Sequence, residues 1–176
     1  MATRQVNVQR FSVTSSRGLD DVIGAIDGVV GHPNMNTFRQ NITNAQTEAE
    51  LERVVNAAVG SAGLMEFTRF DLGEVLRKED GVSAPRSLRL IVGNPLIMTQ
   101  MVKLTPDAGS YAPVTILVDE RPDGVHLSYD TMVSFLAPYG NPEALRVARD
   151  LDEKVEALLT AAAAGGSSPR RDERRT

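Results

Sequence analysis

The chain has 176 residues, of which 41% are hydrophobic and 24% are charged, and its formal net charge at pH 7 is −4. Length and composition are typical of one globular domain. The chain has no cysteine, which excludes disulfides, thiolate metal sites and cysteine nucleophiles. It also has no tryptophan and only 5% aromatic residues, so the core must be built from aliphatic side chains and methionine.

Charge is distributed unevenly along the chain. Residues 165–176 hold four arginines, one aspartate and one glutamate, a balance of +2, so the rest of the chain carries about −6 (−4 minus +2). An acidic body is a poor surface for nucleic acid, and the tail lacks aromatic residues to stack on bases. We therefore expect no nucleic-acid partner, and we predict that residues 165–176 form a disordered, solubilising basic tail.

The N-terminus has no apolar run of signal-peptide length, and no stretch approaches the roughly 18 apolar residues of a membrane span. We therefore expect a cytoplasmic protein without a membrane partner. The lack of cysteine is compatible with a reducing compartment.

The N-terminal part predicts one strand and two helices. Alternation over Gln5–Thr14 indicates a strand, and the apolar spacing that follows indicates a helix from about Gly18 to Val30. Gly31 is expected to end this helix in the left-handed cap conformation. A short helix over Met35–Asn44 is indicated only by Phe38 and Ile42, four residues apart.

The next segment has clearer signals. Thr47 and Glu50 form a capping-box pattern, which predicts the start of another helix. Leu64–Phe70 reads as a strand, and Asp71 is placed to cap a short helix after it.

The central stretch, Leu88–Leu104, predicts a buried strand, a corner at Gly93-Asn94-Pro95 and an apolar helix over Pro95–Leu104. Farther along, Ala112–Glu120 and Val125–Asp130 flank a turn-forming Pro-Asp-Gly segment, which predicts an antiparallel hairpin.

The last helix is predicted to begin after Asn141, with Pro142 at its first position, and to run to about Ala164. Its apolar stripe favours packing on the sheet over a helix dimer; the stripe is Ala144, Ala148, Leu151, Val155, Leu158 and Ala162. The elements together predict a single α+β domain over residues 1–164, with a small antiparallel sheet of about five strands packed with helices.

Three stretches resemble the family catalogued as domain of unknown function 302, with the similarity covering roughly Gly63–Leu159. They are GLMEFTRFDLGEVL, RLIVGNPLIMTQM and YAPVTILVDERPDGVHLSYD. The resemblance implies a compact α+β domain and a homodimer. Many members have cysteine before the Asn-Pro pair and after the proline that opens the next strand, where this chain has Gly93 and Val114. The thiol, haem or metal chemistry suspected for such members is therefore not expected here, and we predict no cofactor and no metal.

The corner admits two interpretations. Asn94 with Pro95 is a helix-capping pattern, and the free N–H groups of a helix start can also bind an anion. No glycine-rich phosphate loop surrounds this corner, so the cap is preferred. Met98 and Met101 similarly fit either core packing, which is preferred, or an adaptable apolar pocket.

The histidines give no recognised catalytic or metal motif. His126, Ser128 and Asp130 are the residue types of a catalytic triad, but they share one strand, where residues two apart lie about 6.5–7 Å from each other. A solvated strand face is the preferred interpretation. His32 lacks any metal-ligand spacing with His126.

The sequence therefore does not identify an activity. The preferred hypothesis is a small-molecule-binding or accessory domain, with a ligand site between the helix Pro95–Leu104 and the sheet. Its candidate residues are Asn94, Met98, Met101, Thr115, His126 and Tyr129. The alternatives are a cofactor-independent enzyme using His126 or His32 with a carboxylate, and a structural homodimeric interaction protein.

Overall fold

The computed structural model describes residues 3–80 and 84–165, so the predicted basic tail, apart from Gly165, lies outside the described residues. The strands are β1 (Arg10–Ser15), β2 (Met65–Asp71), β3 (Ser87–Gly93), β4 (Val114–Arg121) and β5 (Gly124–Asp130). The helices are α1 (Leu19–Asp27), α2 (Met35–Asn44), α3 (Glu48–Ala58), α4 (Leu72–Asp80), α5 (Pro95–Leu104), α6 (Met132–Leu136) and α7 (Pro142–Ala164). Short 3₁₀ turns occupy Pro106–Ser110 and Ala137–Tyr139.

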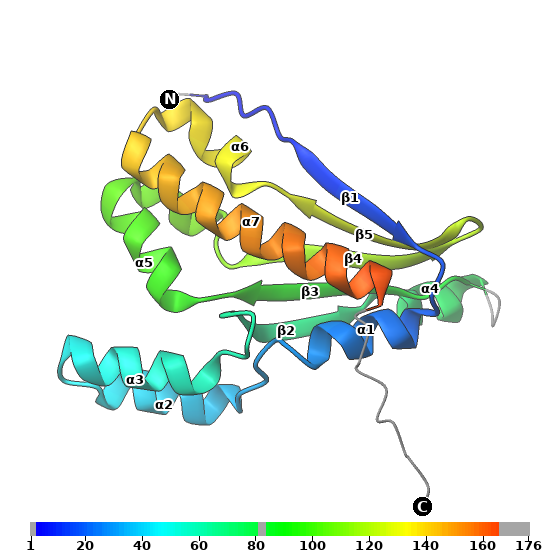
Figure 1. The fold of residues 1–176 in the computed structure, drawn as a ribbon, viewed down its shortest axis with the longest axis horizontal. Helices are drawn as coiled ribbons and strands as arrows, with labels where there is room; N and C mark the ends of the chain where they lie inside the picture. Colours follow the sequence, from blue (N-terminus) through cyan, green and yellow to red (C-terminus); the bar gives the residue numbers. More distant parts are fainter. Residues whose placement is uncertain (1–2, 81–83, 166–176) are drawn as a thin grey trace, which may run out of the picture.

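The strands form one antiparallel sheet in the order β1-β5-β4-β3-β2, which confirms the predicted α+β class (Figure 1). The hairpin β4–β5 and the helix α5 are found where the sequence predicts them. The first strand is shorter than expected, because pairing with β5 begins only at Arg10, opposite Asp130.

One face of the sheet is covered by α7 and α1, which lie side by side across the strands (Figure 1). The inward residues of the strands alternate with outward ones, as half-buried strands require. The predicted stripe of α7 is buried along its whole length, which confirms that this helix packs on the sheet. Among the described helices, none is long and apolar enough to cross a lipid bilayer.

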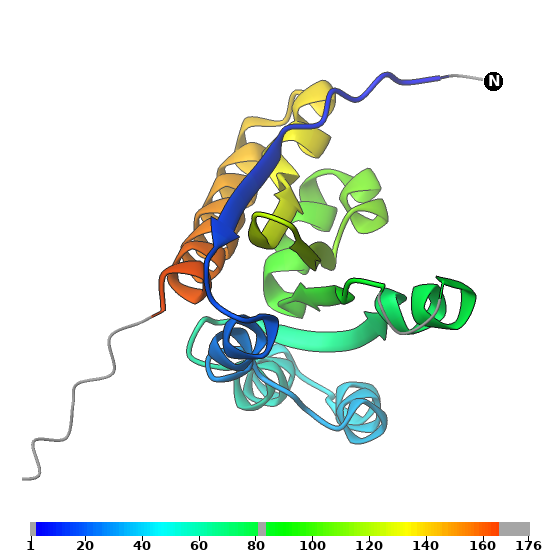
Figure 2. The same ribbon diagram turned by 90° about the vertical axis from the view of Figure 1, so that its right-hand side faces the viewer.

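The opposite face carries exposed or half-buried side chains, including Arg89, Ile91, Thr115 and Leu117. Figure 2 shows α7 and α4 on opposite sides of the molecule. The sheet therefore separates a closed core on the α7 side from an open face.

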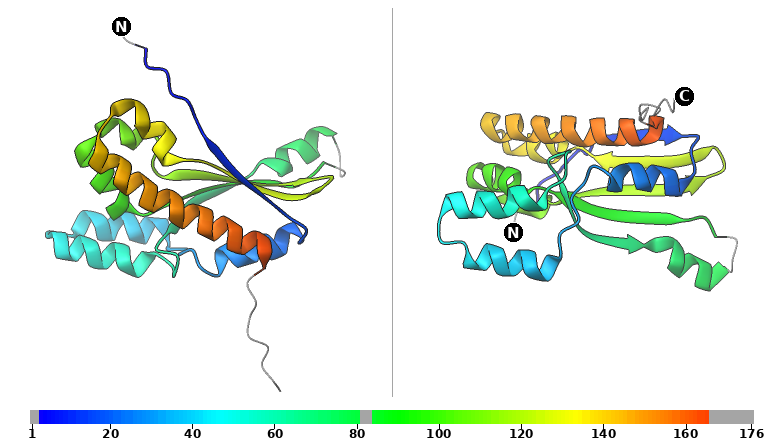
Figure 3. Two further views of the ribbon diagram at one scale, coloured as in Figure 1. Left: turned by 45° about the horizontal axis from the view of Figure 1, so that its top comes forward. Right: turned by 60° about the horizontal axis from the view of Figure 1, so that its bottom comes forward.

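The helices α2 and α3 form an antiparallel pair that lies beside the sheet (Figure 3). They build a second, smaller apolar cluster in which Phe38 and Val55 are buried against Met65 of β2. The burial of Phe38 explains why the short, weakly patterned α2 is nonetheless a helix. The capping box of Thr47 and Glu50 is present at the start of α3.

Gly31 does not cap α1 in the left-handed conformation, contrary to expectation, since α1 already ends at Asp27 and φ of Gly31 is not positive. Its role is a close approach between backbones. A Cβ atom at Gly31 would lie 2.0 Å from the carbonyl oxygen of Ala58. Gly31 also donates to the carbonyl of Leu64 and accepts from the N–H of Glu66, which ties the segment after α1 to β2.

Candidate functional site

The corner between β3 and α5 is held by Asn94 through both ends of its side-chain amide. Oδ1 accepts a hydrogen bond from the N–H of Leu96 at 2.9 Å, which caps α5, and Nδ2 donates to the carbonyl of Gly63 at 2.9 Å. Pro95 follows at the first helical position. Asn94 is therefore a cap, as the preferred interpretation holds, and it also fastens the corner to the loop before β2.

A cavity of about 120 Å³, here called the corner pocket, lies beside this cap. It is formed by α5, the first half of β2, the end of β3, the start of β4 and Leu151 of α7. Its main side chains are Phe67, Asn94, Ile97, Met98, Met101 and Pro113, and Leu151 closes it from α7. Three of the predicted ligand residues, Asn94, Met98 and Met101, are thus brought together.

The corner pocket has no titratable side chain among the described residues that line it. Its one polar side chain is Asn94, and both ends of the Asn94 amide already form a hydrogen bond within the fold. The pocket can therefore select a ligand by shape and apolar contact, and it offers no group for acid–base or nucleophilic chemistry.

The other predicted ligand residues lie elsewhere. Thr115 points to the open face, on the other side of the sheet from its neighbour Val114, which lines the corner pocket. His126 also faces outward, next to Asp123 in the turn, with Nε2 2.8 Å from Oδ1. Tyr129 turns the opposite way into the core. Period-two alternation along β4 and β5 causes this separation.

Asp152, which no sequence pattern singles out, is the partner of Tyr129 beneath α7. One carboxylate oxygen accepts from the Tyr129 hydroxyl and from the N–H of Met132, and the other accepts from the N–H of Val133. Burial raises the pKa of Asp152, although these three hydrogen bonds oppose the rise. The arrangement fastens the start of α6 to α7.

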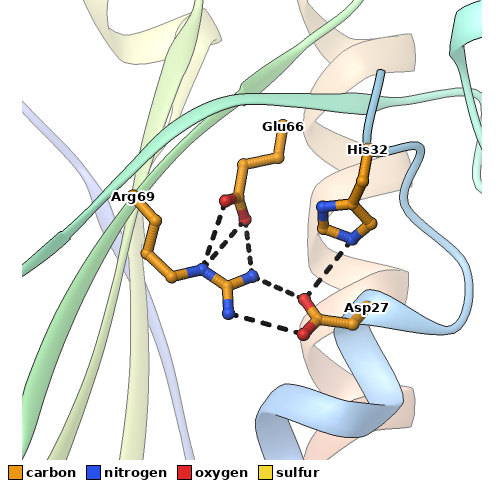
Figure 4. A network of polar contacts seen from close by, with 4 residues as sticks. All are labelled: Asp27, His32, Glu66 and Arg69. Atoms are coloured by element: carbon orange, nitrogen blue, oxygen red, sulfur yellow. Dashed lines mark hydrogen bonds and ion pairs between the residues drawn. The ribbon is translucent and has the colours of Figure 1, made fainter. Parts of the chain in front are cut away.

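A second polar cluster joins α1 to β2, and Figure 4 shows its four side chains. The guanidinium of Arg69 contacts Asp27 at 2.5 Å and Glu66 at 2.6 Å, and Nε2 of His32 lies 3.5 Å from Asp27. Burial lowers the pKa of Arg69, but the hydrogen bonds to both carboxylates outweigh this and leave it raised.

One ligand atom from each of Asp27, His32 and Glu66 lies within 4.8 Å of the others, a spacing that a metal ion could use. Arg69 already provides the positive charge at this position, because its guanidinium bridges both carboxylates. The cluster is therefore an ion-pair clamp between α1 and β2.

A hollow of about 650 Å³ lies over the open face and is here called the trough. Its floor includes Ile91, Thr115 and Leu117. One wall is formed by the stacked rings of Tyr111 and Phe135, whose centroids are 4.6 Å apart. Neither histidine lines the trough or the corner pocket.

Three comparisons place the chain among known proteins. The sequence profile of the family described as "Domain of unknown function DUF302" matches residues 39–162, well over half of the chain. No curated protein matches it. A crystal structure of an uncharacterised conserved protein DUF302 from Bacillus stearothermophilus is similar, with a TM-score of 0.61 and 14% sequence identity over 87% of this chain and 97% of that one. At this identity the similarity shows the fold.

Gly93 and Val114 both line the corner pocket. A Cβ atom on Gly93 would lie 3.1 Å from Cβ of Pro113 and 3.5 Å from Cε2 of Phe67. The glycine therefore keeps space open that a side chain would enter.

Proposed function

Because this chain belongs to the DUF302 family, whose description assigns no activity, we propose a function from its own geometry: it binds a small, mainly apolar ligand in the corner pocket and does no chemistry on it. The observation that carries the proposal is an apolar cavity at the junction of several elements, lined by flexible methionines and free of titratable groups among its described lining residues. Met side chains adapt to ligands of differing shape.

The volume of the corner pocket limits the size of the ligand that it can hold. Apolar cavities of about 150 Å³ in proteins accept molecules such as benzene. The corner pocket, at about 120 Å³, is thus suited to a single ring or a short branched chain, either free or as the end of a larger molecule.

Methionine-methyl NMR tests this directly with benzene as the probe. The chain contains six methionines, so labelled methyl signals form a simple spectrum. We expect benzene to shift the signals of Met98 and Met101 and to leave that of Met132, buried at the start of α6, unchanged. Met98→Trp, which fills the cavity, should abolish the response, with an unchanged Met132 signal showing that the variant is folded. Equal shifts at all methionines, or none at Met98 and Met101, would remove the corner pocket as a ligand site.

The enzyme alternative relies on the pairs His126–Asp123 and His32–Asp27, which do place each histidine beside a carboxylate. Both pairs lie outside the corner pocket and the trough, so neither of these hollows offers them a substrate cavity. The cytoplasmic location and the homodimer stay predictions. Cell fractionation tests the first, and light scattering on the full chain tests the second.

A further inference from the structure

The trough holds one positive charge that no carboxylate of the described chain neutralises. Its charged lining residues are Arg10, Arg89 and Asp130, a balance of +1 from two arginines and one aspartate. Arg10 donates two hydrogen bonds to the carboxylate of Asp130, at 2.6 and 2.8 Å, so these two charges cancel. Arg89 forms no ion pair with any other described residue, and its one side-chain hydrogen bond there goes to the Thr115 hydroxyl at 3.5 Å. An arginine in this position suits a carboxylate, which its planar fork can bind through two oxygens.

Ser128 is a buried hydroxyl of the same trough. It is 7% exposed, and its side chain makes no hydrogen bond with any residue that the structure describes. It lies on the outward side of β5, because its neighbours Leu127 and Tyr129 both face the core. Buried polar groups of native proteins are nearly always hydrogen-bonded. The Ser128 hydroxyl therefore indicates that an occupant of the trough forms a hydrogen bond there.

Strand register places the two groups at the ends of one row. Arg89 of β3 lies opposite Leu117 of β4, and Leu117 lies opposite Ser128 of β5, on three neighbouring strands (Figure 1). Since neighbouring strands are about 4.8 Å apart, the backbones of Arg89 and Ser128 are separated by about 9.6 Å. All three residues line the trough. The row therefore offers a positive charge, an apolar surface and a hydroxyl, in that order.

An aromatic wall runs beside this row. It consists of the half-buried rings of Tyr111 and Phe135, which stack with an angle of 7° between their planes. An aromatic ligand gains from contact with such rings beyond the burial of its apolar area. The volume of about 650 Å³ is within the roughly 300–1,000 Å³ of small-molecule sites. The trough is therefore large enough for a substituted ring.

We propose that the trough binds an aromatic carboxylate that carries a hydrogen-bonding group at the end opposite its carboxylate. The carboxylate pairs with Arg89 beside the Thr115 hydroxyl. The ring lies on Leu117 against the aromatic wall, and the polar group at its other end hydrogen-bonds with Ser128. This site is distinct from the corner pocket, whose lining includes none of Arg89, Leu117 and Ser128.

The outward side of α4 is another exposed apolar surface that a ring could contact. Val75 and Leu76 are 66% and 39% exposed, and neither lines the trough. Gly73, on the opposite side of the helix, packs against the backbone of Arg86 and Ser87. Val75→Glu therefore alters this outward surface without touching the trough, and it serves as a control for non-specific binding.

Methyl NMR titration of the full chain with 4-hydroxybenzoate at pH 7 tests the proposal. We expect the ligand to shift the Leu117 methyl signals and to bind at least about tenfold more tightly than phenol, which lacks the carboxylate. Arg89→Met should lower its affinity at least about tenfold. Arg149→Met removes an exposed arginine of α7 that does not line the trough, and this variant and Val75→Glu should leave the affinity unchanged.

Ser128→Ala, titrated with two ligands, isolates the contribution of the hydroxyl. It should weaken binding of 4-hydroxybenzoate about fivefold and leave the affinity for benzoate unchanged, because benzoate has no group for Ser128 to contact. A dispersed methyl spectrum shows that the variant is folded. Equal losses for the two ligands would overturn the role of Ser128 in binding.

Three further results would overturn the site. They are no shift at Leu117 below about 10 mM ligand, equal losses from Arg89→Met and Arg149→Met, and binding of inorganic phosphate as tight as that of 4-hydroxybenzoate. The last would mean that the trough recognises an anion but no ring. Met98 and Met101 report on the corner pocket, so shifts there without a shift at Leu117 would contradict the trough proposal alone. A failure of benzene to shift them would contradict only the proposal for the corner pocket.

Discussion

The hydroxyl of Tyr129 on β5 lies 2.5 Å from a carboxylate oxygen of Asp152 on α7, and both side chains are buried. This hydrogen bond crosses the main layer of the core. The same carboxylate accepts the N–H groups of Met132 and Val133, so one side chain positions the sheet, α6 and α7 relative to one another.

Asp152→Asn should destabilise the fold by about 1–3 kcal/mol, since the amide NH₂ is a donor and must face at least one backbone N–H, of Met132 or Val133, which then has no acceptor. Glu153→Gln, at the exposed next position, is the matched control and should change the free energy of unfolding by less than about 0.5 kcal/mol. Urea unfolding at pH 7 measures both. Equal stability of the two variants would contradict a structural role for Asp152.

The Tyr129 hydroxyl should make stability depend on pH in alkali. Burial raises the pKa of Tyr129 above its ordinary value of 10.0, and the negative charge of Asp152 raises it further. The unfolded chain therefore loses this proton first, so stability falls as pH rises above 10. Between pH 8 and 11, the wild type should lose about 1.4 kcal/mol more than Tyr129→Phe. Urea unfolding at both pH values gives the difference, and parallel losses would show that Tyr129 ionises as easily when folded.

The clamp between α1 and β2 predicts a large effect for one arginine and a small one for a nearby lysine. Arg69→Met leaves two partly buried carboxylates without their cation and should cost about 1–3 kcal/mol. Lys78→Met removes an exposed i,i+4 pair with Glu74 and should cost no more than about 0.5 kcal/mol. Urea unfolding measures both variants, and similar losses would mean that the clamp contributes no more than a surface pair.

Zinc provides a second readout for the same clamp. Without Arg69, the carboxylates of Asp27 and Glu66 and the imidazole of His32 have no competing cation. Zn²⁺ should therefore raise the melting temperature of Arg69→Met and leave the wild type unchanged. Stabilisation of both proteins would show that the arginine does not hold the cation position.

Two asparagine caps in this chain allow the contribution of helix capping to stability to be separated from that of the additional hydrogen bond to Gly63. Asn34 caps α2 by accepting from Asn36 and Thr37 alone, whereas Asn94 both caps α5 and donates to Gly63. Asn34→Ala should cost about 1 kcal/mol. Asn94→Ala should cost about 1 kcal/mol more, because the Gly63 carbonyl also loses its partner. Equal losses in thermal or urea unfolding would mean that the bond to Gly63 contributes nothing.

The sequence alone predicted the structure correctly where the interactions that determine it join residues close together in the chain. The caps of α3, α5 and α7 depend on residues two or three positions apart, and the stripe of α7 depends on helical spacing. Local patterns of this kind are enough to locate the corner at Asn94 and to put Met98 and Met101 on the helix that follows it.

Tertiary structure decided which side of the sheet each remaining residue faces and what lies there. The sequence already favoured a solvated face for His126, and the structure placed Thr115 on that same face and Tyr129 in the core. In the sequence, Asp152 is only a charged residue in a predicted helix, and the structure shows that the Tyr129 hydroxyl donates to it. Gly31 is required by the carbonyl of Ala58, a contact that sequence spacing does not encode. Local patterns report which side chains share a face, whereas the partner of that face is set by chain segments far away. This is why Phe67 and Leu151 as lining residues of the corner pocket, and the outward side of α4, emerged only from the structure.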